Sequence, residues 1–249
     1  MQISACQLSI VPLRAEPSHR SEIVSQVLFG EQFELLEEEQ DFYRIRLLDT
    51  KYEGWIQNHQ FAEIVLAGVD TDTIVDIAGA QALHDGEVVE LVHGTSIVGE
   101  HITIGKSTYT IQGSLRKTSL QDFDVEFPKL IEYYKSTPYM WGGRSKYGID
   151  CSGFSQVVYK HFGIKLRRDA WQQAEEGSVV DFLSEIHPGD LAFFDNEQGH
   201  ITHVGVMIDP ETIIHASGKV RVDRMDNQGI FNADLNRYTH NLRIVKRYF

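Results

Sequence analysis

The sequence predicts a multi-domain chain in which two small all-β barrels precede an α+β domain with an antiparallel sheet. Three observations support this prediction. Short segments of alternating apolar and polar residues, separated by Gly and Pro, fill residues 1–66. A fainter copy of the same order fills residues 67–118. In residues 119–249 the apolar spacing first becomes helical and then returns to that of strands, which is typical of an α+β domain.

The first barrel is predicted from closely spaced short strands. The run Leu28-Phe29-Gly30-Glu31, followed by Phe42–Arg46 and Gly54-Trp55-Ile56, resembles a bacterial SH3-like domain. The expected strands are Leu8–Leu13, Glu22–Leu28, Gln32–Glu37, Phe42–Leu47, Gly54–Gln57 and Ala62–Val65.

The second barrel is a divergent repeat of the first. Its expected strands are Leu91–Gly94, Ile97–Ile104 and Tyr109–Gly113, with Gly94 standing where Gly30 stood. The third domain begins with helical spacing over Phe127–Tyr134 and a short helix is expected over Asp169–Glu176. Its expected strands are Leu191–Phe194, Thr202–Ile208, Thr212–Ser217, Lys219–Arg224 and Arg243–Tyr248.

Between those helices a glycine-rich, aromatic loop leads into Asp150 and Cys151. Asp150 is an N-cap residue type, and the apolar spacing through Phe162 predicts one amphipathic helix that begins at Cys151. At a helix start the unpaired N–H groups stabilise a thiolate, so we expect a lowered pKa and a nucleophilic Cys151. The alternative is a small buried hydrophobic residue. The small polar neighbours Ser152 and Gly153 favour the nucleophile.

A thiolate nucleophile needs a base, and His203 is the candidate. Strand alternation places His203 and Gly205 on one face, and a glycine there lets another segment come close. If Asp209–Glu211 forms a three-residue loop, Gly205 pairs with His215 and the two histidines are diagonal neighbours. A two-residue loop would turn His215 away, so this prediction depends on the register.

Composition excludes several classes of function. The formal net charge of −13 argues against a nucleic-acid or anionic-membrane partner. Two distant cysteines, Cys6 and Cys151, exclude a disulfide framework and favour a reducing compartment. Met1–Cys6 superficially resembles a lipoprotein cleavage site but has neither a basic nor an apolar region, so we expect no signal peptide and a cytoplasmic protein.

Five motifs resemble, in order and spacing, the NlpC-type papain-like cysteine peptidases, which cleave peptidoglycan peptides. They are Tyr139–Gly143, Asp150–Phe154, Pro188–Leu191, His203–Gly205 and Ile214–Ser217. The resemblance implies a papain-like catalytic domain with Cys151 as nucleophile, His203 as general base and His215 as the residue that orients it. It also implies that the Cys151 N–H and the Tyr139 hydroxyl stabilise the oxyanion. Trp141 is a substrate contact or a packing aromatic.

The whole chain is similar to a narrower subgroup, the γ-D-glutamyl-L-diamino-acid endopeptidases (dipeptidyl-peptidase VI), which carry SH3-like domains before the catalytic domain. In that subgroup the first barrel limits the cleft to peptides with a free N-terminal L-alanine. The amine would be held by acidic and tyrosyl groups. The corresponding residues are Glu22, Tyr52, Asp150, Ser152 and Asp169. Ala170 departs from the serine often found after this Asp, so any contact at this position comes from the backbone or is absent.

The resemblance implies hydrolysis of the γ-D-glutamyl-diamino acid amide in peptidoglycan-derived peptides, without metal or organic cofactor. Two alternatives stay open: an amidase or acyltransferase with the same site, and a wall-peptide binding protein whose cysteine is idle. A metal site is a lesser alternative, because His200, His203 and His215 have no further Cys or carboxylate at a recognisable spacing. The sequence leaves open which diamino acid is preferred, what the second barrel does and the oligomeric state.

Overall fold

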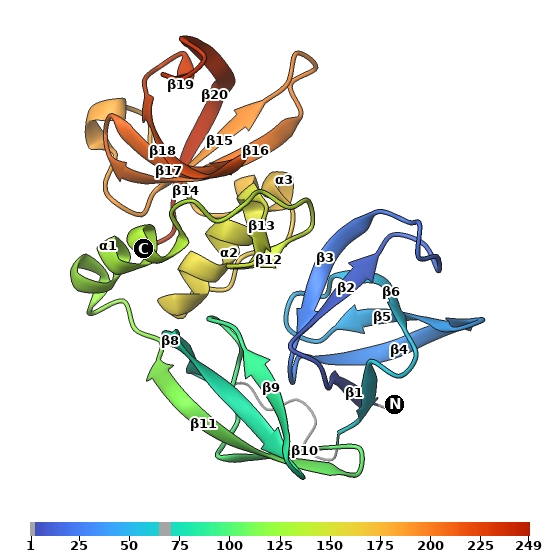
Figure 1. Cartoon of the computed structure of the whole chain (residues 1–249). Helices are drawn as coiled ribbons and strands as arrows, with labels where there is room; N and C mark the ends of the chain where they lie inside the picture. Colours follow the sequence, from blue (N-terminus) through green and yellow to red (C-terminus); the bar gives the residue numbers. More distant parts are fainter. Residues whose placement is uncertain (1–2, 65–70) are drawn as a thin grey trace. The chain divides into compact units, whose positions relative to one another are not determined.

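The computed structural model describes residues 3–64 and 71–249, which divide into two compact units (Figure 1). Unit 1 extends to Phe123 and also contains Lys160–Ile164. Unit 2 contains Asp124–Tyr159 and Lys165–Phe249. The predicted boundary between residues 66 and 67, and the end of the predicted strand at Val65, lie outside the described residues.

Unit 1 begins with a seven-stranded antiparallel sheet in the order β3-β2-β6-β5-β4-β1-β7. The six predicted strands are present, and β1 was missed because its four residues, Ile3–Cys6, are too few to reveal an alternation. Aliphatic and aromatic side chains such as Leu13, Phe33 and Ile45 are fully buried between the strands. The strands are β1 Ile3–Cys6, β2 Ile10–Arg14, β3 Ile23–Leu28, β4 Gln32–Glu39, β5 Phe42–Leu47, β6 Glu53–Gln57 and β7 Phe61–Glu63.

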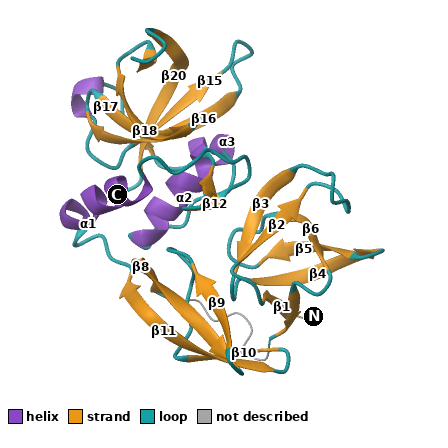
Figure 2. Ribbon diagram, in the orientation of Figure 1, coloured by secondary structure: helices purple, strands orange, loops and turns teal. Residues whose placement is uncertain are grey.

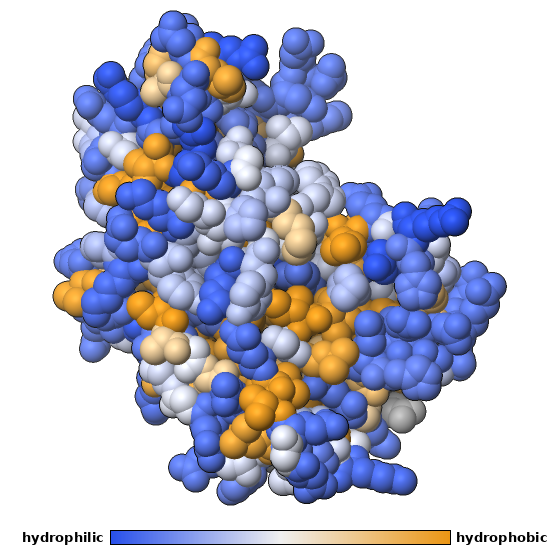
Figure 3. Space-filling view, in the orientation of Figure 1, coloured by the Kyte–Doolittle hydropathy of each residue, from blue (hydrophilic) through white to orange (hydrophobic). Residues whose placement is uncertain are grey.

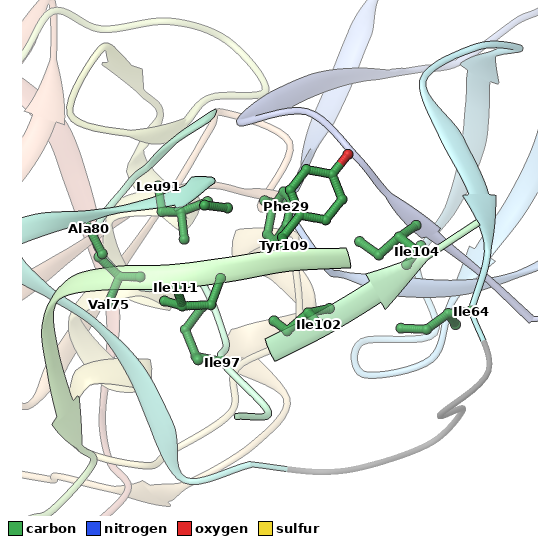
Figure 4. Packing of buried hydrophobic residues seen from close by; sticks show 12 residues of the cluster. Phe29, Ile64, Val75, Ala80, Leu91, Ile97, Ile102, Ile104, Tyr109 and Ile111 are labelled. Carbon is green, nitrogen blue, oxygen red and sulfur yellow. The ribbon is translucent and has the colours of Figure 1, made fainter. Parts of the chain in front are cut away.

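A four-stranded antiparallel sheet in the order β10-β11-β8-β9 follows in unit 1. The strands are β8 Thr73–His84, β9 Glu87–Leu91, β10 His101–Ile104 and β11 Ser107–Lys117. Two predicted strands were misplaced: β9 ends at Leu91, and β10 begins only at His101, because the chain turns at Gly94 with φ +85°. The sheet's core includes Leu91 and Ile111 together with Phe29, which lies in the turn after β3 (Figure 4). This segment is all-β, as predicted.

The three α-helices of unit 2 lie on one side of its sheet (Figures 1 and 2). The predicted helices are confirmed in position. They are α1 Phe123–Tyr134, α2 Cys151–His161 and α3 Ala170–Ala174. The 3-10 turn η1 Leu183–Glu185 was not predicted.

The sheet of unit 2 has the order β14-β20-β15-β16-β17-β18-β19, and β19 also pairs with β20. The strands from β15 to β20 therefore close on themselves. The five predicted strands correspond to β15–β18 and β20, whereas β12, β13, β14 and β19 were missed because each has four residues or fewer. The bounds are β12 Arg144–Ser145, β13 Gly148–Ile149, β14 Ser178–Val179, β15 Leu191–Asp195, β16 Ile201–Asp209, β17 Thr212–Ser217, β18 Lys219–Met225, β19 Gly229–Asn232 and β20 Arg237–Arg247.

Helix α2 is buried on every side, so the prediction of an amphipathic helix was wrong. Every residue from Cys151 to Tyr159 is buried. Its polar side chains are compatible with burial because they are hydrogen-bonded: Ser155 donates to Gln173 at 2.7 Å, and Gln156 donates to the Leu166 carbonyl at 2.9 Å. Gly153 is required at its place, because a Cβ there would lie 2.2 Å from the Gly143 carbonyl oxygen.

Hydrophilic residues cover most of the face shown in Figure 3. Mean hydropathy is −0.26, and the surface accommodates the excess of acidic side chains. Among the described residues, no helix has both the length and the apolar character needed to cross a bilayer.

Candidate active site

The Asp150 carboxylate fixes the start of helix α2. Its Oδ1 accepts the Gly153 N–H at 2.7 Å, which is an N-cap bond, and its Oδ2 accepts the Gly142 N–H at 2.9 Å. Arg168 donates to both oxygens, at 3.1 and 2.5 Å, and Ser152 Oγ donates at 3.3 Å. These bonds join the helix, the preceding loop and the segment before α3 at one carboxylate.

Cys151 is the first residue of α2, as predicted, and its side chain is only 7% exposed. The expected lowering of its pKa was wrong. Burial raises the pKa of the Cys151 thiol to about 12, the neighbouring Asp150 adds to the rise, and the backbone groups of Val204 and Ser152 offset it only in part. The resting sulfur is therefore a thiol, and it lies against Val204, the residue that follows His203.

The register of strands β16 and β17 brings His203 and His215 together. Gly205 pairs with His215, as predicted, but the predicted three-residue loop was wrong. Asp209 pairs with Thr212 across a two-residue loop, and a β-bulge at Ile208 restores the register. Gly205 is needed here, because a Cβ would lie 2.9 Å from the Cβ of His215.

The two histidines are hydrogen-bonded and belong to a longer chain of contacts. His203 Nε2 lies 2.8 Å from His215 Nδ1, and His215 Nε2 lies 3.0 Å from Asp223 Oδ2. Arg221 donates to both oxygens of Asp223, at 2.6 and 2.8 Å. The ring of His240 stacks on that of His203, with centroids 4.1 Å apart.

Burial keeps these histidines neutral. It lowers the pKa of His203 well below 6.5, and the nearby His215 and His240 lower it further. Burial also lowers the pKa of His215, although its bond to Asp223 opposes the change. The pKa of His240 falls to about 4, chiefly by burial. At neutral pH the site therefore contains a thiol and a neutral imidazole that can accept its proton.

Tyr139 lies close enough to Cys151 for the two groups to interact electrostatically. Burial raises the pKa of the Tyr139 hydroxyl, and the thiolate that Cys151 forms at high pH and the Asp150 carboxylate raise it further, so at neutral pH the hydroxyl keeps its proton and can donate a hydrogen bond. Its backbone is held on two sides. The Tyr139 N–H donates to the Gly218 carbonyl at 3.0 Å, and the residue bridges Ile149 in parallel.

The side chains of two predicted amine-binding residues are hydrogen-bonded to other groups of the protein. Asp150 accepts five hydrogen bonds from Gly142, Ser152, Gly153 and Arg168, which fills the acceptor capacity of a carboxylate. Ser152 Oγ donates to Asp150 and accepts from Arg168 at 2.7 Å. Both side chains are buried and position the nucleophile rather than offering a vacant acceptor.

The other predicted substrate-binding side chains are exposed or half-buried. Trp141 is 60% exposed, so it is not a packing aromatic of the core. Asp169 is half-buried at the N-cap of α3, where its N–H donates to Gln172 at 3.1 Å. In unit 1, Glu22 is exposed and Tyr52 is half-buried against the core of the first sheet.

One group of described residues has a geometry that could hold a metal ion. The ring nitrogens of His203, His215 and His240 lie within 4.8 Å of one another. His200, which the metal alternative included, is exposed and outside this group. A metal bound to both His203 Nε2 and His215 Nδ1 would have to replace their 2.8 Å hydrogen bond. The present arrangement is that of a proton relay.

Three residues of the site were missed by the sequence prediction. Arg168 was not predicted, although it directly precedes Asp169 and a buried Asp150 requires a cation. Asp223 could have been found, because the tight turn at Gly218 places Arg221 opposite His215 and Asp223 diagonal to it. His240 had no recognisable motif, and only the folding of β20 beside β15 brings it to His203.

A cysteine at a helix start whose sulfur lies against the residue after His203, together with a buried pair of hydrogen-bonded histidines, is an arrangement typical of a cysteine hydrolase. Residues 136–238 match the NlpC/P60 family, and residues 13–61 match the bacterial dipeptidyl-peptidase SH3 domain. The chain is thus a cysteine peptidase with an NlpC/P60 domain that follows an SH3-like domain. These matches confirm the family resemblance inferred from the five motifs.

Several relatives match over most of their length. The γ-D-glutamyl-L-lysine dipeptidyl-peptidase of Bacillus subtilis is 27% identical, over 78% of this chain and 72% of that one. The dipeptidyl-peptidase 6 of Lysinibacillus sphaericus is 25% identical, over 87% of this chain and 89% of that one. A Bacillus cereus γ-D-glutamyl-L-lysine dipeptidyl-peptidase is 41% identical, but this match spans only 24% of that protein and 32% of this one. A crystal structure of an NlpC/P60 family protein from Bacillus cereus matches 99% of both chains with a TM-score of 0.78 at 16% identity, which shows the fold alone.

The neutral resting state predicts the pH dependence of the reaction. Because His203 must be unprotonated to accept the thiol proton, kcat/KM rises as pH increases through the pKa of His203, which burial places below 6.5. We therefore expect the acid limb of the kcat/KM profile below pH 6.5. Initial rates between pH 4 and 8 check this, and a midpoint above 6.5 would contradict a buried neutral base.

That profile needs a control for unfolding. Buried neutral histidines bind fewer protons than their unfolded counterparts below about pH 6.5, so the free energy of unfolding also falls in acid. Circular dichroism at each pH separates a loss of fold from protonation of the base.

Proposed function

We propose that this protein hydrolyses the amide bond between γ-D-glutamate and an L-diamino acid in peptidoglycan-derived peptides that begin with a free L-alanine. The main support is the Cys151–His203–His215 arrangement within an NlpC/P60 domain that a dipeptidyl-peptidase SH3 domain precedes. The names of the Bacillus subtilis and Lysinibacillus sphaericus relatives support the substrate class.

The reaction follows from the protonation states of the site. In the first step His203 takes the thiol proton through its Nδ1, since its Nε2 faces His215, while the sulfur attacks the γ-carbonyl carbon. His203 then gives that proton to the leaving amine, and the diamino acid departs. A water molecule, deprotonated by His203, attacks the thioester, which releases L-Ala-D-Glu and restores the thiol.

Two donors are suited to stabilise the oxyanion of each tetrahedral intermediate. Cys151 is the first residue of α2, so no earlier helical turn accepts its N–H. Tyr139 interacts with Cys151 and keeps its hydroxyl proton, because burial raises its pKa. Donors that are fixed before the reaction lower the barrier without reorganisation at the moment of attack.

We assign recognition of the substrate amine to Glu22, Tyr52 and Asp169. Within unit 1, Ile23 pairs with Arg14 and Arg14 pairs with Trp55, so β3 and β6 run parallel on either side of β2. Glu22 and Tyr52 each precede one of these two strands and lie at the same end of the sheet, roughly 10 Å apart across two strand spacings. A carboxylate and a hydroxyl there fit an ammonium group.

The second sheet of unit 1 is proposed to be a divergent SH3-like repeat, because both sheets of this unit contain a glycine turn with the same hydrogen bonds. In the first sheet Gly30 N–H donates to the Cys6 carbonyl at 2.9 Å, and Cys6 N–H donates to the Glu31 carbonyl at 3.2 Å. In the second, Gly94 N–H donates to the Val75 carbonyl at 3.0 Å, and Val75 N–H donates to the Thr95 carbonyl at 2.9 Å. Both glycines have positive φ, +74° and +85°.

A cytoplasmic location also stays a prediction, which fractionation of the host cell tests.

The first test of function is product analysis with the tripeptide L-Ala-γ-D-Glu-L-Lys or its diaminopimelate equivalent. We expect L-Ala-D-Glu and a free diamino acid, without added acceptor or metal, because water suffices as the second nucleophile. Mass spectrometry identifies the products. Cys151→Ala should abolish release of the diamino acid. Cys6→Ala is the control and should retain it, because Cys6 belongs to the core of the first sheet and is distant in sequence from Cys151.

The alternatives give different results in that experiment. Product that forms only when a second amine is added indicates an acyltransferase. Hydrolysis that persists in Cys151→Ala would rule out the proposed nucleophile, and an inactive wild type that still binds the peptide indicates a binding protein.

The second test concerns the oxyanion. Tyr139→Phe removes one donor, and loss of one such donor typically lowers kcat by about 10²-fold. We expect that decrease with little change in KM, because the donor acts on the charge that develops in the transition state. Tyr147→Phe, an exposed tyrosine of the same loop, is the matched control. Equal kcat values for Tyr139→Phe and the wild type would remove Tyr139 from the mechanism.

The third test concerns the amine. N-acetylation of the alanine removes the ammonium charge, and Glu22→Gln removes one of its partners. Hydrogen bonds to charged groups contribute about 1.5–3 kcal/mol, so each change should lower kcat/KM by roughly 10-fold or more. Glu16→Gln, an exposed acid in the preceding loop, is the control. Equal turnover of blocked and free peptides would contradict the assignment.

A further inference from the structure

The Asp223 carboxylate lies at the end of a buried chain of hydrogen bonds that starts at His203. Asp223 is 7% exposed and His215 is 1% exposed. Three neighbouring strands supply one member each: His203 on β16, His215 on β17 and Asp223 on β18. Asp223 is also held by Arg221, which donates from two nitrogens at 2.6 and 2.8 Å. The carboxylate is therefore fixed in position and in charge.

The charge of Asp223 determines which hydrogens the two histidines carry. A carboxylate can only accept, so His215 Nε2 must donate across the 3.0 Å contact. A neutral His215 then has a bare Nδ1, which must accept across the 2.8 Å contact from His203 Nε2. A neutral His203 with a protonated Nε2 has a bare Nδ1. That nitrogen is the one with capacity to accept the thiol proton.

We propose that Asp223, held by Arg221, is a positioning residue that fixes the tautomers of His215 and His203 and so prepares His203 Nδ1 as the base. The proposal rests on the proposed function, because it takes His203 as the base. Asp223 does not touch the reacting atoms and acts through His215. When His203 takes up the proton, its imidazolium is stabilised through the same chain by the Asp223 charge.

A purely structural role for Asp223 is the competing explanation, because a buried Arg-paired carboxylate also stabilises a strand. Asp190 offers a matched comparison. It is 2% exposed and accepts from two nitrogens of Arg247, at 2.9 and 2.7 Å, and from the backbone N–H of His187 at 2.8 Å rather than from a histidine ring. A variant of Asp190 therefore loses a buried ion pair without a change to the relay.

The test compares Asp223→Asn, Asp223→Glu and Asp190→Asn. An Asn at 223 can present its amide N–H₂ to His215, which reverses both tautomers and leaves His203 Nδ1 protonated. We expect kcat to fall on the order of 10²-fold or more with KM within about threefold, since loss of the equivalent carboxylate in Ser-His-Asp enzymes has a large effect on kcat alone. Asp223→Glu should recover part of kcat. Asp190→Asn should lower the melting temperature but keep kcat within about threefold.

A direct readout does not depend on the substrate. In protein with ¹⁵N-labelled histidine at pH 7.5, long-range ¹H–¹⁵N correlation spectra should show Nε2–H tautomers for His203 and His215, and a change at both rings in Asp223→Asn. Alkylation of Cys151 by iodoacetamide, followed by peptide mass spectrometry, should slow in the same variant and not in Asp190→Asn.

These readouts separate two failures. If the wild type does not cleave the peptide but the tautomers and the alkylation rate change as expected, the proposed substrate is wrong and the relay stands. Unchanged tautomers together with unchanged kcat in Asp223→Asn would overturn the role of Asp223. A loss of kcat matched by Asp190→Asn would assign Asp223 to stability alone.

Discussion

Both oxygens of the Asp150 carboxylate are occupied inside the protein, and the position of the nucleophile depends on them. They accept from Gly142 in the loop, from Gly153 in α2 and from Arg168 before α3. Removal of one partner of a buried ion pair typically costs 3–5 kcal/mol, because the remaining charge is left uncompensated. Cys151 follows Asp150 directly, so any relaxation there moves the sulfur. A substrate ammonium would have to compete with Arg168 for this carboxylate, which makes binding by Asp150 unfavourable.

The same burial that fixes Cys151 also sets its protonation. A thiol with a pKa of about 12 next to a histidine with a lowered pKa stays neutral at rest, whereas an ion pair would need two buried charges. The charges then develop only as the sulfur attacks, when Tyr139 can donate to the oxyanion and His215 can accept from the imidazolium. Charge is therefore separated only in the transition state, where the oriented groups stabilise it most strongly.

Sequence patterns predicted those parts of the site that depend on local order. Cys151 at a helix start follows from Asp150 and the apolar spacing after it, and the strand β17, Thr212–Ser217, has the predicted bounds. Burial could not be predicted in the same way. The predicted amphipathic helix requires a polar face, but Ser152, Ser155 and Gln156 are each covered and hydrogen-bonded to residues ten or more positions away. The predicted lowering of the Cys151 pKa was wrong for the same reason. Desolvation outweighs the helix dipole, and desolvation is a property of the packed domain.

The histidine pair shows how narrowly the register must be set. The side-chain period of a strand is two, so a shift of one residue between β16 and β17 would turn His215 to the opposite face. The two-residue loop Pro210–Glu211 alone would produce that shift, and the bulge at Ile208 cancels it. Gly205 then allows His215 to approach His203 diagonally, and the turn at Gly218 sets His215 diagonal to Asp223. Because each diagonal uses a different pair of strands, the proton relay requires all three strands in register at once, and an error in either hairpin would separate the base from the carboxylate that orients it.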